Sequence, residues 1–178
     1  TVDLTSPSPA QTQTMYAFRD GTLATPTTTG LPILPRSTMA VAGGVNAIAG
    51  GAPNGWYEDL ASGQRVVTDV VADLNVVAYV GTDVQPDPCL TSLPAYIYAR
   101  EYVSAKSLIE VGGVPAAYAY ASEGAVGIEL VGLDSPTSSF PVMSLVYSKE
   151  TTGGLAPVKI VNPSVSGGHR LSWRLLSQ

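Results

Sequence analysis

Few side chains in this sequence are able to act as a nucleophile, an acid, a base or a metal ligand. The single histidine, His169, follows two glycines just before a strand-like segment, and the chain contains no Gly-x-Ser-x-Gly motif. A serine hydrolase needs its histidine between a nucleophile and an orienting carboxylate. We therefore expect His169 to be an exposed turn residue and the protein not to be an enzyme.

Aspartates around a predicted central hairpin are the next candidates. Asp69, Asp73 and Asp83 lie close enough in sequence to suggest the paired carboxylates of a glycosidase, which stand about 5–10 Å apart. A turn explains Asp73 better, and the end of a strand explains Asp83. Asp83 and Asp87 are a further candidate pair for metal binding, supported by only two carboxylates. We predict no catalytic residue, no metal ligand and no cofactor.

Tyrosines and one cysteine complete the candidates. Tyr96, Tyr98 and Tyr102 share one face of a predicted strand, where rings pack against a neighbouring sheet or stack on a sugar. We expect packing and keep sugar or partner binding as the alternative. Cys89 is the only cysteine, so it forms neither an internal disulfide nor a thiolate zinc site. We expect a half-buried apolar residue, with pairing to another chain as the alternative.

Composition limits the function classes. The 178 residues fit one domain, 13% are charged, 45% are hydrophobic, and there are 18 glycines and 14 prolines. This balance suits an extracellular or capsid-like β protein. The net charge of −5, with nine Lys and Arg, argues against nucleic acid as a partner. No apolar run is long enough to span a membrane.

The elements that must position these residues are short strands between Gly, Pro, Asp and Ser. We predict strands over residues 14–19, 64–71, 76–82, 95–103, 107–111, 125–131, 142–149, 158–161 and 171–176, with a turn over 72–75. Residues 39–42 predict a brief strand or one helical turn, and no amphipathic helix of ordinary length is evident. The fold class is all-β, with β-propeller blades or a β-sandwich as the architecture.

Several motifs, in order along the chain, resemble the C-terminal β-propeller region of PilY-type proteins, the factors associated with type IV pilus tips. The most distinctive is an aromatic strand and turn with Trp56, Tyr57, Asp59, Gly63 and Arg65. The closing segment carries Arg170, Trp173 and Arg174. Weaker matches are the aromatic strand 15–22, the pair Arg36-Ser37 and the triplet Asp87-Pro88-Cys89. These residues match scaffold positions and do not by themselves define a binding site.

The resemblance implies about three to four blades of about 40–45 residues each. Such an incomplete ring has unpaired strand edges, so we expect a companion chain to supply the remaining blades, or the chain to be a processed or split piece. Family propellers carry an Asp-rich loop that looks like a calcium site. The matching region, 106–127, holds Glu110 and Glu123 as its only carboxylates, so calcium binding is left open.

The resemblance also implies a function. We expect a non-enzymatic, secreted component of the type IV pilus system, at the fimbrial tip and associated with the outer membrane, that acts in pilus assembly and surface adhesion. Its expected partners are minor pilins, with a host surface or glycan as a further partner. Loops over 22–35 and 84–94 are the expected contact segments, because loops on rigid β scaffolds carry contacts. The alternatives are a viral capsid or spike β domain and a carbohydrate-binding β module.

Overall fold

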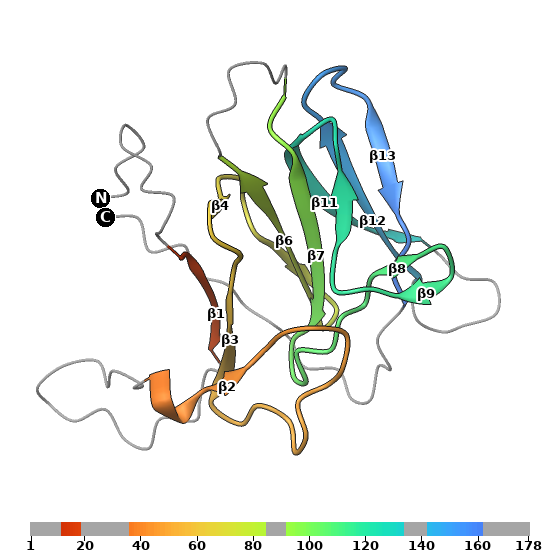
Figure 1. The fold of residues 1–178 in the computed structure, drawn as a ribbon. Helices are drawn as coiled ribbons and strands as arrows, with labels where there is room; N and C mark the ends of the chain where they lie inside the picture. The colour runs from red at the N-terminus through yellow and green to blue at the C-terminus, as the bar shows by residue number, and fades with distance from the viewer. Residues whose placement is uncertain (1–11, 19–35, 85–91, 134–141, 162–178) are drawn as a thin grey trace, which may run out of the picture.

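β-strands make up nearly all of the regular structure in the computed structural model, which describes residues 12–18, 36–84, 92–133 and 142–161 (Figure 1). The strands are β1 (Thr14–Phe18), β2 (Ala40–Val41), β3 (Gly55–Asp59), β4 (Gln64–Val66), β5 (Val71–Asp73), β6 (Val76–Asp83), β7 (Ala95–Glu101), β8 (Glu110–Val111), β9 (Val114–Pro115), β10 (Ala119–Ala121), β11 (Ala125–Leu133), β12 (Val142–Lys149) and β13 (Leu155–Val158). One 3-10 turn, η1 (Arg36–Thr38), precedes β2. The all-β fold class is confirmed.

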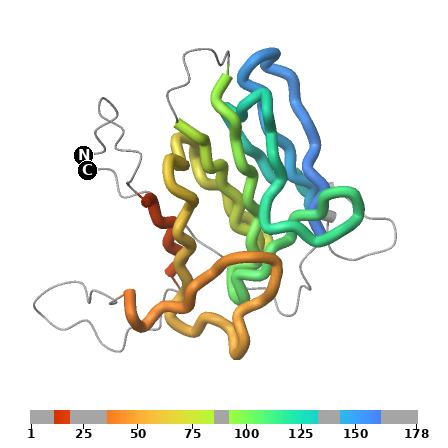
Figure 2. The backbone as a smooth tube through the Cα atoms, viewed as in Figure 1, coloured from red at the N-terminus to blue at the C-terminus, as the bar shows by residue number. Residues whose placement is uncertain are grey.

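Three sheets lie side by side in the order in which the chain forms them (Figures 1 and 2). The first sheet has the order β1-β3-β2, the central sheet β10-β7-β6-β4 with β5 also on β6, and the third sheet β11-β12-β13. Strands β8 and β9 form a separate small hairpin. None of these sheets closes into a barrel. Separate sheets packed face to face occur in both propellers and sandwiches, so the number of blades stays a prediction.

The central sheet is buried on both faces because most residues of its two long strands, β6 and β7, are apolar. On β6, Val76, Ala78 and Val80 point toward the third sheet, where they meet Leu145 and Val158. The intervening residues of β6 point toward the first sheet. Successive side chains of a strand face opposite ways, so a strand covered on both sides reads as a continuous apolar run.

The second core lies between the first and central sheets. Trp56 is fully buried there, against Val77, Tyr79 and Tyr98 of the central sheet. Full burial of such a side chain stabilises the fold by about 3 kcal/mol. Trp56 therefore packs between the first and central sheets.

The central hairpin differs from its prediction in two respects. Its turn lies within the predicted range 72–75 but comprises Leu74 (φ 41°) and Asn75 (φ 70°) alone, two left-handed residues that suit a tight two-residue connection. Ala72 and Asp73, predicted in the turn, belong to β5 and pair with Val77 and Val76. The strand predicted over 64–71, however, is wrong as a single element: β4 and β5 both pair with β6 but are separated by residues 67–70. The chain advances five residues between Val66 and Val71 while β6 advances three, so the extra residues leave the ladder.

Other strand predictions agree to within a few residues. Strand β12 has the predicted bounds, and β2 resolves residues 39–42 as a strand. The strand predicted over 158–161 is displaced, because β13 ends at Val158 and Ile160 makes an isolated bridge to Ile109. The short strands β9 and β10 were not predicted. The strand predicted over 171–176 lies outside the described residues.

The described part of the chain contains no helix with the length and apolar character needed to cross a bilayer.

Candidate functional site

Strand β3 sends alternate side chains to two very different environments. Trp56 and Glu58 face the central sheet and are buried, whereas Tyr57 and Asp59 face outward. Gly55 allows the strand to begin: its φ is +98°, and a Cβ there would lie 2.1 Å from the carbonyl oxygen of Ala17. The distinctive aromatic motif of the sequence is therefore a two-sided structural element.

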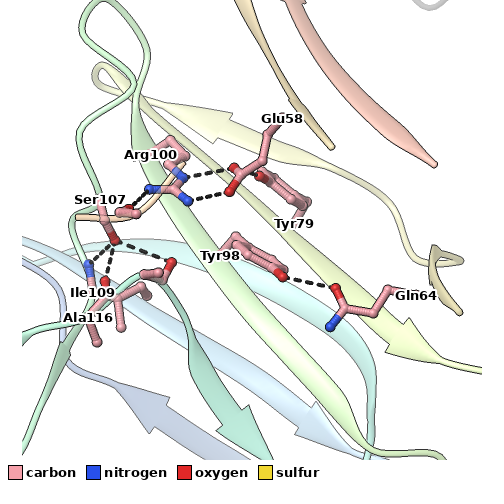
Figure 3. Close-up of polar contacts among 10 residues, drawn as sticks. Glu58, Gln64, Tyr79, Tyr98, Arg100, Ser107, Ile109 and Ala116 are labelled. Atoms are coloured by element: carbon pink, nitrogen blue, oxygen red, sulfur yellow. Dashed lines mark hydrogen bonds and ion pairs between the residues drawn. The ribbon is translucent and has the colours of Figure 1, made fainter. Parts of the chain in front are cut away.

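On the inner face, a buried ion pair joins β3 to the central sheet (Figure 3). The Arg100 guanidinium donates through Nε to Glu58 Oε2 at 2.9 Å and through Nη2 to Glu58 Oε1. Tyr79 Oη donates to the same carboxylate, and Arg100 Nη1 donates to the Gly44 carbonyl at 2.6 Å. With Arg100 0% exposed, this cluster cross-links four segments and gives its charges no access to a ligand.

Tyr98 extends this inner cluster. Its ring stacks on Tyr79 with centroids 4.9 Å apart, and its hydroxyl donates to Gln64 Oε1 at 2.9 Å (Figure 3). Burial raises the pKa of both tyrosines above the ordinary phenol value, and the Glu58 carboxylate adds to the effect. Both hydroxyls therefore act as donors within the fold, as expected of packed rather than sugar-binding tyrosines.

On the outer face, Arg36 covers the exposed side of β3. Its guanidinium lies 4.1 Å from the centroid of the Tyr57 ring and pairs with Asp59 at 2.5 Å. Asp59 also accepts a hydrogen bond from Thr14 Oγ1 at 2.6 Å. That bond, together with Arg36, lowers the pKa of the Asp59 carboxyl. Cation–π and ion-pair contacts thus hold an arginine in place at a solvent-facing surface.

Two further rings complete what we call the outer aromatic face: Tyr16, Phe18 and Tyr57, with Arg36 and Asp59. Tyr16 and Phe18 lie two residues apart on β1, and their rings are nearly parallel, at 7°, with centroids 5.9 Å apart. Tyr16 stands opposite Tyr57 in the strand register. Phe18 is 53% exposed. This face combines exposed rings on β1 and β3 with a charge pair between Asp59 of β3 and Arg36 of η1.

A second tyrosine group lies at the edge of the central sheet. Tyr118 and Tyr120 are 42% and 57% exposed, and both contact Tyr96, at centroid distances of 5.0 Å and 5.4 Å. Of the three tyrosines predicted on one strand face, Tyr98 is buried, while Tyr96 and Tyr102 are partly buried against the same core. Tyr118 and Tyr120 were not singled out in the sequence, because they follow a glycine-rich turn without a clear strand pattern.

The residues predicted from the family resemblance are placed as follows. Gly63 is in a turn with φ +85°, and Arg65 is buried on β4, opposite Thr82. Trp56, Tyr57 and Asp59 lie on β3 as described above. Cys89, His169, Arg170, Trp173 and Arg174 are outside the described residues, as are Asp87, the loop over 22–35 and residues 85–91 of the loop over 84–94.

Sequence reasoning missed Glu58 and Arg100 as a pair. Each is a charged residue one position before the end of its strand, and each follows a large aromatic by two positions, which puts it on the same core-facing side. A charge at such a position indicates a buried partner, because an unpaired charge is rarely buried. That signal was present on both strands.

The carboxylates considered for calcium are engaged elsewhere. Glu110 pairs with Lys159 at 2.5 Å, and Glu123 pairs with Lys149 at 2.7 Å. Across the described residues, no group of three or more His, Cys, Asp or Glu side chains is arranged to hold a metal ion. Asp69 precedes β5 and Asp73 is its last residue, and both are exposed. Asp83 ends β6.

Comparisons with protein-family models, with curated proteins and with solved structures each find no match to this chain. The PilY-type resemblance therefore stays a hypothesis that depends on the motif residues themselves.

Proposed function

We propose that this protein is a non-enzymatic, secreted binding scaffold of the type IV pilus system, similar in role to the tip-associated PilY-type factors. It acts in pilus assembly and surface adhesion, with minor pilins as its partners. The observation that carries the binding role is the outer aromatic face, where Arg36 is fixed over Tyr57 beside exposed rings. The pilus assignment itself depends on the sequence resemblance.

The outer aromatic face has the composition of a protein-binding surface. Tyrosine and arginine are enriched among the residues that dominate binding energy at protein interfaces. Arg36 is already oriented by Tyr57 and Asp59, so binding would order little additional side-chain freedom. Strands β1 and β3 hold the three rings and Asp59, and the short 3-10 turn η1 holds Arg36.

Stacked sheets also support the proposal. Three sheets packed face to face in chain order are what consecutive propeller blades would give. The Trp-Tyr motif on which the resemblance depends forms the inner and outer faces of one strand. The polar network around Glu58 and Arg100 is enclosed by protein groups, as suits a structural role for these residues within a scaffold.

The test uses the organism that encodes the chain. Deleting the gene is expected to reduce surface pili, counted by electron microscopy, and surface attachment, and the wild-type gene is expected to restore both. Complementation with Arg36→Ala combined with Tyr57→Ala should restore secretion but not attachment. Val114→Ala, at an exposed position on β9 in a separate hairpin, is the matched control and should behave like wild type. Normal piliation and attachment in the deletion strain would refute the proposal.

A second candidate function, carbohydrate binding, is favoured by the exposed pair Tyr118 and Tyr120 beside Tyr96. Flat rings stack on the apolar faces of sugars. Glycan-array binding that is lost in Tyr120→Ala and kept in Tyr16→Ala would support this function. Tyr98→Ala is unsuitable for the test, because Tyr98 is buried and its loss would disturb the core.

A further inference from the structure

Strand β1 forms one border of the first sheet. It pairs with β3 on one side, and no described strand pairs with its other side (Figure 1). An unpaired strand edge presents backbone donors and acceptors at the spacing of another strand. The question is which residues of β1 present those groups.

Hydrogen bonds around β3 fix the answer. Leu60 N donates to Gln13 O at 2.9 Å, which makes that antiparallel pair a hydrogen-bonded one. Hydrogen-bonded pairs recur at every second residue of an antiparallel ladder, so Met15 and Ala17 also bond to β3. Ala42 N donates to Tyr57 O at 2.7 Å on the opposite side of β3, which confirms the phase. The backbone groups of the alternate residues in β1 point away from the sheet.

Thr14, Tyr16 and Phe18 are those alternate residues. The carbonyl of Phe18 accepts a hydrogen bond from the hydroxyl of Tyr102. The N–H and C=O of Tyr16, at the centre of β1, are directed into the space beside the strand. A single residue of an incoming strand would satisfy both groups.

A shallow, mostly apolar hollow of about 250 Å³ runs along this edge. Its lining includes four successive residues of β1, Met15 to Phe18, which places the hollow beside the strand and not over one of its faces. Val70, Ala72 and Val77 line the other side. The hollow offers room for apolar side chains from a strand that pairs with β1.

We propose that the edge of β1 binds an extended segment of another polypeptide, which adds to the first sheet as a strand and places alternate small apolar side chains in the hollow. The segment carries basic residues at its ends, because exposed Asp69 and Asp73 flank the lining residues Val70 and Ala72. Main-chain bonds to Tyr16 supply affinity, and the hollow supplies side-chain selection. The inference goes beyond the pilus role and holds for any partner that supplies such a segment.

The experiment measures binding of a synthetic peptide, acetyl-Lys-Val-Thr-Val-Thr-Val-Lys-amide, to the full chain by calorimetry. Hydrogen exchange of the Tyr16 amide is followed by NMR in parallel. We expect saturable binding and slower exchange at Tyr16 when the peptide is present. The same peptide with N-methyl groups on alternate residues cannot form a ladder and should not bind. Equal binding of the two peptides, or no binding of either, would overturn the proposal.

Two variants at one position separate backbone from side-chain recognition. Tyr16→Pro removes the edge N–H while leaving the bonds to β3, and proline is tolerated at strand edges. It should weaken peptide binding by about tenfold, the effect of one lost hydrogen bond. Tyr16→Ala keeps the N–H and should bind nearly as wild type. The reverse order would show that the ring is recognised, and would refute strand addition.

A third variant protects the test against misfolding of Tyr16→Pro. Ala72→Leu fills the hollow at a partly buried position and leaves the residues of β1 unchanged, and it should reduce peptide binding while the melting temperature stays close to wild type. Unchanged binding in Ala72→Leu would contradict the role of the hollow. Slow exchange at Tyr16 in the peptide-free chain would also overturn the proposal, since the edge would then be taken by this chain or by a second copy. The count of pili in the deletion strain tests the proposed pilus function separately from this peptide-binding experiment.

Discussion

Neighbouring residues on β3, Glu58 and Asp59, each pair with an arginine, and the two pairs differ in almost every physical respect. The Glu58–Arg100 pair has side-chain exposures of 8% and 0%, whereas the Asp59–Arg36 pair has 43% and 46%. The inner pair joins three sheet strands and a glycine-rich loop. The outer pair lies over one ring at the surface.

The comparison shows that arginine–carboxylate pairs on neighbouring residues of one strand lie in opposite environments, one buried between sheets and one exposed to solvent. Charges inside the fold interact strongly and also lose much hydration, so removing one partner leaves a costly unpaired charge. Exposed charges are screened by water and salt, so their removal changes stability little. Arg36 is therefore available to a partner, and Arg100 is not.

The largest effect is expected from breaking the inner pair. Glu58→Gln keeps the shape of the side chain but leaves the Arg100 guanidinium without its counter-charge. We expect the free energy of unfolding to fall by about 3–5 kcal/mol, measured by urea denaturation. Asp59→Asn, one residue along on the other face, is the matched control.

A double variant sharpens this result. Glu58→Leu with Arg100→Met replaces the buried pair by apolar side chains, and such replacements are often neutral or stabilising. The double variant should therefore be more stable than Glu58→Gln alone. If the double variant is less stable than Glu58→Gln, the buried ion pair contributes net stability that apolar packing does not replace.

The next largest effect is expected from Gly55→Ala, which tests whether the close approach of β1 and β3 at Gly55 requires a glycine. A Cβ at this left-handed position would clash with the Ala17 carbonyl. We expect a loss of stability on the order of 1–3 kcal/mol by thermal denaturation. Gly43→Ala, where a Cβ would meet no atom within 4 Å, should be nearly neutral. Equal effects of the two substitutions would contradict the described register of β1 and β3.

Local patterns predicted the strands well, because each depends on its own alternation and turn residues. Strand β12 and the turn at Leu74 and Asn75 are examples. The break between β4 and β5 was not predictable, since it depends on pairing with β6 across the turn. The residues between the two strands, Val67 to Val70, include two valines and a threonine, which favour strands, so local β-propensity does not mark the break.

The candidate sites were less predictable than the fold. The sequence identified Trp56, Tyr57 and Asp59 as notable, but not that their side chains divide between two environments. Arg36 contacts β3 from about twenty residues away in sequence, and Arg100 from about forty. Spacing arguments reach a few residues along one element, whereas these pairs depend on how sheets pack.

A moderate effect is expected from the buried tyrosines at high pH. The folded chain raises the pKa of Tyr98, so the unfolded chain ionises first, near pH 10, while the folded chain keeps its proton. The free energy of unfolding should therefore be independent of this group below about pH 10 and fall above it. Urea unfolding between about pH 8 and 11 checks this.

Tyr98→Phe is the informative variant for that series. It removes the hydrogen bond to Gln64 and should lower stability at neutral pH by about 1 kcal/mol. It should also make the alkaline fall less steep, because one titrating group is lost. An unchanged slope would mean that other tyrosines, Tyr79 among them, account for the alkaline loss.

The smallest effect is expected from the outer pair, and this prediction decides whether the two faces of β3 differ as described. Asp59→Asn should lower the melting temperature by no more than about 2 °C, because exposed ion pairs contribute little. The wild-type melting temperature should likewise change little between about 0.02 M and about 0.5 M salt, apart from general salt effects shared by the variant. A loss as large as that of Glu58→Gln would mean that the outer pair holds β1 and η1 onto the fold. Arg36 would then be a structural residue, and the outer aromatic face would lose the feature that favours it as a binding surface.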